Sequence, residues 1–321
     1  MTRPSAVPPP VTAVLDASSR WLPVRLGEVE EKLREAIGSP ERALGEEAAA
    51  TLAAGGKRLR PMLVLLCAGE AGGENQVRSA AAIELVHMAT LVHDDVLDDA
   101  PLRRGSPTIF ATGGRPRAIG TGDLLLARAF ALLGAAGQAR EVALLATASV
   151  ALARGELAQR QDAFNLDLEE ERYLARCRLK TASLFECACQ LGHDDERLRR
   201  FGADVGLAFQ LLDDVLDVSG PPERTGKARG TDLLDGTVTL PLIEAARSEL
   251  TLREVDLRAL DPAGAEALCD RIAATGALER VRERAFAMVA EAKRALAEGS
   301  FEPEQRRLLE LVADGVVQRY S

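Results

Sequence analysis

The stretch Asp94-Asp95-Val96-Leu97-Asp98 places three carboxylates in an apolar, helix-forming context, and Asp213-Asp214-Val215-Leu216-Asp217 repeats the pattern later in the chain. We call these stretches the first and second aspartate runs. On an α-helix of 3.6 residues per turn, the first and fifth residues of each run project from nearly one face. Like charges at that spacing destabilise an isolated helix. Because Mg²⁺ prefers oxygen ligands and fills its shell with water and substrate phosphates, the runs predict a site for Mg²⁺ and a diphosphate.

The sequence around the two runs predicts an all-α protein. Aromatic residues make up only 3% of the chain, and no long alternation of β-branched residues is present. Gly72-Gly73, Gly113-Gly114 and Asp261-Pro262 are typical of helix ends. We expect helices near residues 24–37, 41–54, 59–71, 76–99, 116–135, 139–163, 169–191, 195–217, 239–249, 263–275, 277–297 and 303–320.

No linker is long enough to separate two domains. We therefore expect a disordered N-terminal head over residues 1–20, followed by one catalytic domain over 21–321. Its architecture should be a single-domain antiparallel helical bundle around a central cavity. Both aspartate runs end their helices, so two antiparallel helices could face their carboxylates across that cavity.

Composition narrows the class of protein. The chain has 321 residues, 47% of them hydrophobic, and a net charge of −9, so a nucleic-acid partner is not indicated. No apolar stretch has the length of a membrane span, and the start of the chain lacks the apolar core of a signal peptide. The five cysteines have no metal-ligand spacing and are expected to be reduced and buried. These features favour a soluble cytoplasmic protein.

Basic residues follow and precede the first run. Arg103 and Arg104 come just after the acids, and guanidinium groups there could form salt bridges or grip phosphate oxygens. His87 lies two turns before Asp94 on the same helical face, where it could donate to a phosphate. His93 is off that face, and we interpret it as structural.

The segment Gly55-Gly56-Lys57-Arg58-Leu59-Arg60-Pro61 sets three cations around a glycine turn and a helix start. Backbone amides at a helix start favour an anion. The glycine-to-lysine spacing differs from that of a nucleotide-binding P-loop. A solvated basic turn is an equally good interpretation of these residues alone.

Polar residues also accompany the second run. Lys180 and Thr181 lie in an otherwise apolar helix, and Gln210 shares the face of Asp213. A buried lysine needs a partner. Lys227 lies in a glycine-containing loop and could close over a diphosphate, or it could simply be solvated. Glu156, in Gly155-Glu156-Leu157-Ala158-Gln159, is interpreted as a helix–helix contact.

Taken together, these segments resemble the all-trans isoprenyl diphosphate synthases, or polyprenyl synthetases, of the medium- to long-chain type. The resemblance extends from about Leu44 to Arg319 and rests on six segments: Gly55 to Pro61, Asp94 to Gly105, Gly122-Asp123, Lys180-Thr181, Gln210 to Asp217 and Gly230 to Leu233. It implies the isoprenoid synthase fold, a homodimer, and condensation of isopentenyl diphosphate with an allylic diphosphate in the trans configuration. A catalytically dependent or regulatory subunit of a heteromeric synthase, with a possible small partner subunit, is the alternative of another class.

The resemblance also implies roles for residues. It implies groups that bind three Mg²⁺ ions, the allylic diphosphate and isopentenyl diphosphate. The metal ligands would be Asp94, Asp95, Asp98, Asp213, Asp214 and Asp217. Arg103, Lys180 and Lys227 would hold the allylic diphosphate, and Lys57, Arg60, His87 and Arg104 would hold isopentenyl diphosphate. Lys180 and Thr181, where the helix would have to bend, and Gln210 would face the developing allylic cation, so these three and Arg103 are the expected catalytic groups.

Product length is predicted from the helix that carries the first run. Ala89 and Thr90 occupy places where short-chain relatives carry aromatic stoppers, so the tunnel should stay open. We expect a product of about thirty to fifty carbons, with a twenty-carbon geranylgeranyl product as the alternative. Thr237 departs from the family pattern, which often has lysine there. A terpene cyclase is disfavoured, because such enzymes usually replace the second aspartate run.

Overall fold

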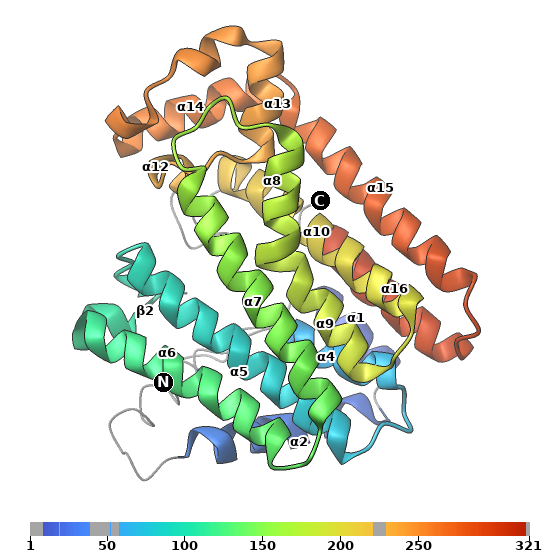
Figure 1. Ribbon diagram of the computed structural model, residues 1–321. Helices are drawn as coiled ribbons and strands as arrows, with labels where there is room; N and C mark the ends of the chain where they lie inside the picture. Colours follow the sequence, from blue (N-terminus) through green and yellow to red (C-terminus); the bar gives the residue numbers. More distant parts are fainter. Residues whose placement is uncertain are drawn as a thin grey trace. The chain divides into compact units, whose positions relative to one another are not determined.

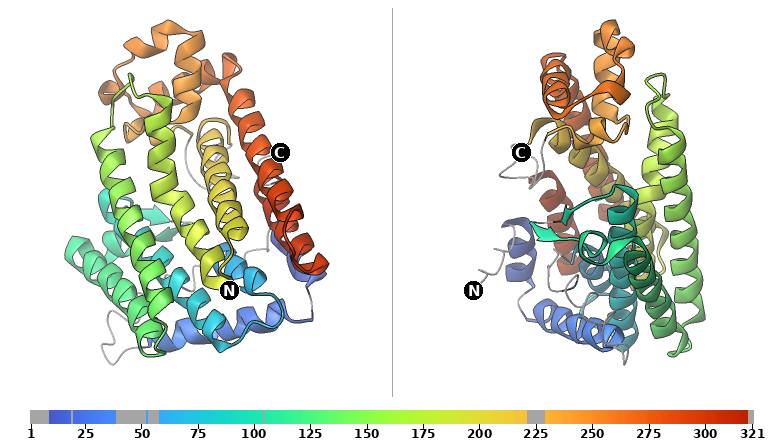
Figure 2. Two further views of the ribbon diagram at one scale, coloured as in Figure 1. Left: turned by 45° about the vertical axis from the view of Figure 1, so that its right-hand side comes forward. Right: turned by 90° about the vertical axis from the view of Figure 1, so that its left-hand side faces the viewer.

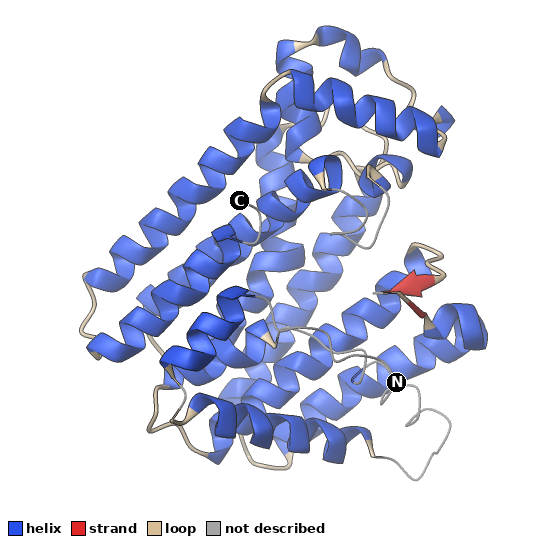
Figure 3. Cartoon of the chain, turned by 180° about the vertical axis from the view of Figure 1, so that it is seen from behind, coloured by secondary structure: helices blue, strands red, loops and turns tan. Residues whose placement is uncertain are grey.

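The computed structural model describes residues 9–18, 20–38, 52, 58–103, 105–220 and 229–318. Over these ranges the chain is almost entirely helical. The only sheet among the described residues is a short antiparallel pair, β1 (Leu102–Arg103) and β2 (Ser106–Pro107), drawn in red in Figure 3. The expected all-α class is confirmed. None of the described helices is long and apolar enough to span a membrane.

The chain divides into two compact units, each assembled from segments that are separate in sequence. Unit 1 contains Met1–Ser149, Cys187–Arg199 and Ser300–Gly315; unit 2 contains Val150–Glu186, Arg200–Gly299 and Val316–Ser321. Neither unit is a continuous domain, because the segments alternate along the chain. The expected domain boundaries and central cavity remain predictions.

Part of the expected disordered head is helical in the structure. Helix α1 spans Pro9–Ala17, beginning with prolines that a first helical turn tolerates. Val14 is 1% exposed, and the hydroxyl of the buried Ser18 donates to its carbonyl at 2.5 Å. Val14 is thus buried within a segment for which the proline-rich composition predicted disorder.

Helix α5 (Glu74–Leu97) is a largely buried helix of unit 1. It packs against α2 (Leu22–Ile37), α4 (Leu59–Ala68) and α6 (Ile109–Gly134), and Figure 1 shows α5 and α6 running side by side. Its buried residues are spread around the helix, as expected for a helix covered on several sides. The Gln76 side chain accepts a hydrogen bond from the Gly73 amide (2.9 Å), which caps its first turn.

Two segments of unit 1 differ from the sequence expectation. The helix expected from residue 116 begins at Ile109, where the Thr108 hydroxyl accepts from the Ala111 amide (3.0 Å). Gly114 interrupts it with φ of 77°, so the glycine pair produces a kink instead of a helix end. The helix expected near 41–54 falls outside the described residues except at Leu52.

Four helices contribute residues to both units. They are α7 (Ala139–Gln161), α9 (Ser183–Gly192), α10 (Glu196–Ser219) and α16 (Pro303–Gln318). Helix α10 carries the second aspartate run and matches the expected range of 195–217 closely. Helix α9 is the continuation of a segment that was expected to be one helix over 169–191.

Unit 2 holds the remaining helices. These are α8 (Glu170–Cys177), the π-helical turn η1 (Arg178–Ala182), α12 (Thr231–Leu234), α13 (Leu240–Ser248), the 3₁₀ turns η2 (Leu250–Glu254) and η3 (Leu257–Ala259), α14 (Pro262–Ala274) and α15 (Ala277–Ala297). Helices α13 and α14 pack against α15, and both Figure 1 and Figure 2 show them next to it. Asp261 caps α14 by accepting from the Gly264 amide (2.7 Å).

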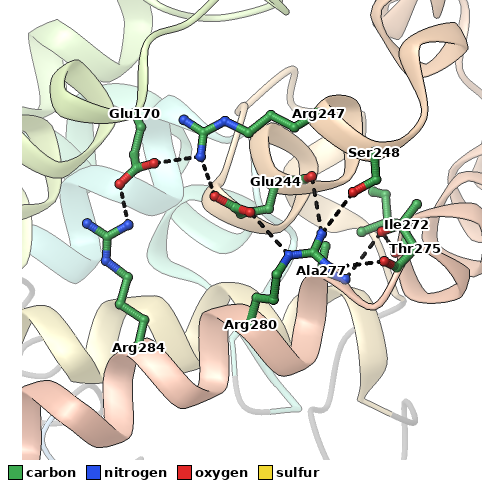
Figure 4. Close-up of polar contacts among 9 residues, drawn as sticks. All are labelled: Glu170, Glu244, Arg247, Ser248, Ile272, Thr275, Ala277, Arg280 and Arg284. Carbon is green, nitrogen blue, oxygen red and sulfur yellow. Dashed lines mark hydrogen bonds and ion pairs between the residues drawn. The ribbon is translucent and has the colours of Figure 1, made fainter.

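An ion-pair network joins α8, α13 and α15 (Figure 4). Arg247 contacts Glu170 (2.8 Å) and Glu244 (2.5 Å). Arg280 reaches Glu244 from α15 (3.3 Å), and Arg284 pairs with Glu170. Because Glu170 begins α8, the network anchors the start of the segment that leads into η1.

Candidate active site

The first aspartate run lies at the C-terminal end of α5. Asp95 is 5% exposed, Asp94 is half-buried, and Asp98, which caps the helix, is exposed. The Asp98 amide donates to the Asp94 carbonyl (2.9 Å), so helical geometry continues to the end of the run. Asp94 and Asp98 therefore lie one turn apart at an accessible helix end.

Arg103, on β1, lies against this run. Its Nε donates to Oδ1 of Asp95 (2.7 Å), and the short strand pair with Ser106 and Pro107 holds its backbone. A guanidinium has five N–H donors, so an arginine can hold a carboxylate and still bind a phosphate oxygen. The salt bridge and the phosphate role considered for Arg103 are thus compatible.

Arg58 is held by acidic residues of unit 1. At the start of α4 it adopts φ of 48°, an unusual value for a residue other than glycine. Its guanidinium pairs with Glu30 on α2 (2.5 Å) and with Glu84 on α5 (2.9 Å), whose side chain is 4% exposed. Of the three cations that the sequence sets around the glycine turn, Arg58 therefore stabilises the packing of α4 on α2 and α5 through its ion pairs.

Residues expected to bind isopentenyl diphosphate or to shape the tunnel follow on α4 and α5. Burial lowers the pKa of Arg60 to about 10, against the opposing effect of Glu84. His87 is half-buried on α5, Ala89 is 2% exposed, and the half-buried Thr90 donates its hydroxyl to the His87 carbonyl (2.8 Å). His87 thus places a polar side chain before the first aspartate run, and Ala89 and Thr90 place small side chains beside it.

His93 packs closely on α6. Its Nε2 lies 3.4 Å from Oδ1 of Asp123 and 3.4 Å from the carbonyl of Ile119. A Cβ atom on Gly122 would lie 2.2 Å from that same nitrogen, so any other residue there would require the imidazole to move. The Gly122-Asp123 pair is thus explained by helix packing, and His93 fits its structural interpretation.

The second aspartate run in unit 2 is tied to other predicted groups by hydrogen bonds. Gln210 donates to Oδ1 of Asp214 (2.7 Å), and the Thr181 hydroxyl donates to Oε1 of Gln210 (2.6 Å). The hydroxyl of the fully buried Tyr173 donates to Oδ2 of Asp214 (2.5 Å). Tyr173, Asp214, Gln210 and Thr181 form a continuous chain, which we call the Tyr173–Thr181 chain.

The three aspartates of this run differ in environment. Asp213 is exposed, Asp214 is 3% exposed, and Asp217 accepts from the Asp232 amide (3.2 Å). Burial and the nearby charge of Asp232 raise the pKa of Asp214 to about 8, although hydrogen bonds from Tyr173 and Gln210 oppose the rise. Concentrated carboxylates of this kind are stabilised by a cation.

The donor set fits a divalent metal ion. The side chains supply hard oxygens, which suit Mg²⁺ and Ca²⁺. Among the described residues, no three His, Cys, Asp or Glu side chains already gather closely enough to form a protein-only metal site. Mg²⁺ is usually bound by one or two carboxylates together with water and phosphate oxygens, so such a ready-made cage is not required.

Lys180 and Thr181 lie within η1, a π-helical turn between α8 and α9. Such turns are rare and occur frequently at functional sites. The ammonium of Lys180 lies 2.6 Å from Oε2 of Glu156 on α7. A Cβ atom on Gly155 would lie 2.5 Å from the Lys180 backbone nitrogen, so this glycine lets α7 approach the turn. The helix is thus irregular at Lys180-Thr181, where a bend was expected.

Several expected site residues cannot be placed. Lys57, Arg104 and Lys227 lie outside the described residues. Within unit 1 the structure brings Arg103 to Asp95, and within unit 2 it joins Thr181 and Gln210 to Asp214. The sequence reasoning missed Tyr173, which carries no motif and lies 41 positions from its partner Asp214.

Comparison with known proteins identifies the family. A family model described as polyprenyl synthetase matches residues 41–263. Component 2 of the heptaprenyl diphosphate synthase of Geobacillus stearothermophilus is 44% identical over 245 residues, covering 73% of this chain and 77% of the relative. An all-trans-nonaprenyl-diphosphate synthase of Rhodobacter capsulatus, described as geranyl-diphosphate specific, is 39% identical over 246 residues, covering 72% and 76%.

A solved structure agrees over almost the whole length. The polyprenyl synthase of Caulobacter crescentus, in complex with calcium and isoprenyl diphosphate, superimposes with a TM-score of 0.88 and 33% identity. The match covers 99% of this chain and 100% of that one, which confirms the isoprenoid synthase fold. The chain belongs to the polyprenyl synthetase family and is a polyprenyl diphosphate synthase, a prenyltransferase.

Proposed function

We propose that this chain condenses isopentenyl diphosphate with an allylic diphosphate in the trans configuration, using Mg²⁺. The family uses divalent metal ions, and the carboxylates described above suit Mg²⁺. We assign three ions to the two aspartate runs, with the following ligands: Asp94, Asp95, Asp98, Asp213, Asp214 and Asp217.

The Tyr173–Thr181 chain is the observation that carries this proposal. It connects a buried carboxylate of the second run to Gln210 and Thr181, next to Lys180. A diphosphate needs cations, and a developing allylic cation needs dipoles with their oxygens toward it. A cation, Lys180, and two dipolar side chains, Thr181 and Gln210, thus occur in one part of unit 2.

The proposed reaction breaks the C–O bond of the allylic diphosphate and forms a C–C bond to isopentenyl diphosphate. Bound Mg²⁺ would neutralise charge on the departing diphosphate. Arg103, Lys180 and Lys227 would hold that diphosphate, while Lys57, Arg60, His87 and Arg104 would hold isopentenyl diphosphate. Thr181 and Gln210 would orient dipoles toward the allylic carbon, and the released diphosphate would accept the proton lost in the last step.

We assign a medium- to long-chain product of about thirty to fifty carbons. The relatives named above are a heptaprenyl and a nonaprenyl diphosphate synthase, both within this range. Ala89 and Thr90 support the same assignment, because small side chains leave room for a growing chain beside the first run. Geranylgeranyl diphosphate is the shorter alternative.

The working assembly is a separate proposal. We infer that the chain is cytoplasmic, because the free cysteines of the described residues are all buried and a reducing compartment suits such thiols. We also infer a homodimer, as the resemblance to the polyprenyl synthetases implies. The Geobacillus relative is named component 2, which supports a heteromeric synthase with a small partner as the second candidate.

Product analysis tests these assignments. The purified chain is incubated alone with Mg²⁺, labelled isopentenyl diphosphate and geranyl, farnesyl or geranylgeranyl diphosphate in turn. Products of thirty or more carbons are expected. A stop at twenty carbons would replace the open-tunnel assignment with the geranylgeranyl one. Inactivity of the folded chain with every primer would favour the dependent subunit.

A further inference from the structure

Glu156 is an acidic residue that lies beside Lys180, which we propose binds the allylic diphosphate. Its Oε2 lies 2.6 Å from the ammonium of Lys180, and the two side chains are 18% and 29% exposed. Arg160, one turn later on α7, donates to the other carboxylate oxygen (2.9 Å). A single carboxylate therefore lies between two basic side chains, at hydrogen-bonding distance from each.

The backbone of α7 fixes this arrangement. Gly155 is buried, and a Cβ atom there would lie 2.5 Å from the backbone nitrogen and 2.8 Å from Cα of Lys180. The helix therefore approaches η1 more closely than any other residue would allow, and it delivers the next residue, Glu156, directly to the Lys180 side chain. Such close contact distinguishes the pair from a surface ion pair formed by two flexible side chains.

Glu156 stays charged near neutral pH. Burial would raise its pKa, but Lys180 and Arg160 lower it by more, and the pKa lies below the ordinary value for glutamate. In the absence of a diphosphate, the ammonium of Lys180 is thus neutralised by a residue of this chain. An incoming diphosphate must compete with that residue.

We infer that Glu156 is a positioning residue that serves as the resting counter-ion of Lys180 and is displaced from it by the diphosphate. The inference rests on the proposed role of Lys180 in binding the allylic diphosphate. Each condensation leaves one inorganic pyrophosphate behind, and the product must be released from it before the next allylic diphosphate can be held. By recapturing Lys180, Glu156 would weaken the grip on pyrophosphate and so promote its release.

A counter-ion role and a purely structural role of Glu156 predict opposite changes in pyrophosphate affinity when the residue is substituted. Loss of a merely structural contact would weaken ligand binding, whereas loss of a competing counter-ion tightens it. We expect Glu156→Gln to lower the Kd for pyrophosphate in the presence of Mg²⁺ about twofold to fivefold, the range expected for a partly exposed ion pair. The same substitution should leave the Kd unchanged when Lys180→Gln is also present.

The experiment measures pyrophosphate binding by calorimetry, with Mg²⁺, for the full-length wild type, the two single variants and the double variant. Glu171→Gln is the matched control, because it removes the same charge from an exposed position on α8. It should leave the Kd unchanged, which excludes a general effect of net charge. Glu156→Asp, which keeps the charge but shortens its reach, should lower the Kd in the same direction and carries the test if Glu156→Gln misfolds.

The outcomes separate the inference from the function on which it rests. If Lys180→Gln weakens pyrophosphate binding and Glu156→Gln tightens it, the counter-ion role stands. If Lys180→Gln weakens binding but Glu156→Gln weakens it too or has no effect, the counter-ion role is wrong while the role of Lys180 survives. If Lys180→Gln does not change binding, Lys180 does not hold the diphosphate, and both assignments fail.

Discussion

At the scale of single residues, the Tyr173 hydroxyl shows how a group outside any motif can orient a carboxylate that we propose as a metal ligand. The phenol is fully buried and donates to Asp214 at 2.5 Å. Burial and the neighbouring Asp214 charge raise the pKa of Tyr173, so it remains a hydrogen-bond donor at any physiological pH. A carboxylate held from both sides, by Tyr173 and Gln210, presents its oxygens in a defined direction.

Tyr173→Phe should therefore weaken metal-dependent activity while the protein stays folded. Loss of a group that orients a metal ligand typically costs about tenfold to a hundredfold in metal affinity or activity. The measurement is the Mg²⁺ concentration that gives half-maximal prenyl transfer, which should rise. Ser183→Ala, which removes a hydroxyl bonded to the Leu179 carbonyl outside this chain of contacts, is the control. An unchanged Mg²⁺ dependence in Tyr173→Phe would contradict the orienting role.

Thr90 allows a test of product length. It is half-buried, so a larger side chain there meets less resistance than at Ala89, which is 2% exposed and where overpacking would cost about 1–3 kcal/mol. Thr90→Phe should shorten the main product, because the ring would fill space that the growing chain needs. Products are compared by chromatography after identical incubations. Thr90→Val keeps the size of the side chain and should leave product length unchanged; equal products from wild type and Thr90→Phe would place the tunnel elsewhere.

At the scale of elements, helix positions followed from the sequence better than helix irregularities did. The helices that carry the aspartate runs were expected at 76–99 and 195–217 and are found at Glu74–Leu97 and Glu196–Ser219. Apolar periodicity and glycine breaks are local signals, so they suffice to predict where these helices begin and end. The π-helical turn at Arg178–Ala182 lies against Gly155 of α7, a close approach that no local pattern reveals.

Gly155→Ala tests that dependence. The added methyl would lie 2.5 Å from a backbone atom of Lys180, so α7 or η1 must shift. We expect lower stability and a rise in KM for the allylic diphosphate, since Lys180 and Thr181 would move. Gly120→Ala on α6 is the control, because nothing lies within 4 Å of its added methyl. In a helix interior that control should be neutral or stabilising by up to about 1 kcal/mol.

The network of Figure 4 should make the packing of α8, α13 and α15 pH-dependent. Burial would raise the pKa of Glu170, but hydrogen bonds from Arg284 and Arg247 lower it below its ordinary value near 4.5. A lowered pKa contributes stability above the unfolded-state pKa, and the contribution is lost as the pH falls through the folded-state value. Glu170→Gln should thus reduce the free energy of unfolding at pH 7, by at most about 1 kcal/mol for such exposed pairs.

Denaturant titrations at pH 7 and at pH 3 measure this effect. The difference between wild type and Glu170→Gln should shrink at the lower pH, because protonation of Glu170 removes the charge that pairs with Arg247 and Arg284. Glu171→Gln, one residue later and exposed, should show no difference at either pH. A difference that is the same at both pH values would mean that Glu170 acts through packing and not through charge.

At the scale of the whole molecule, the site residues predicted from the sequence are divided between the two units. The first run and Arg103 belong to unit 1, and the second run, Thr181 and Gln210 belong to unit 2. The motifs were recognisable because each is a short local pattern. Partners such as Glu30 and Glu84 for Arg58, or Tyr173 for Asp214, lie tens of residues away in sequence and emerge only from packing.

If both runs serve one metal-bound diphosphate, ligand binding should depend on both together. Pyrophosphate with Mg²⁺ should raise the melting temperature of the wild type, by an amount equivalent to about 2.7 kcal/mol at a ligand concentration one hundred times the Kd. Removal of metal with EDTA should abolish the rise. Asp98→Asn and Asp213→Asn are the informative variants, because both side chains are exposed and neither substitution should impair folding.

Either substitution alone should remove most of the rise, and the two together should remove little more, because a shared ion loses its site when either side fails. The control Asp167→Asn removes an exposed carboxylate outside both runs and should preserve the full rise. Losses that add independently would mean that the two runs bind separate ions without a common diphosphate. In that case the assignment of both runs to one diphosphate would be wrong.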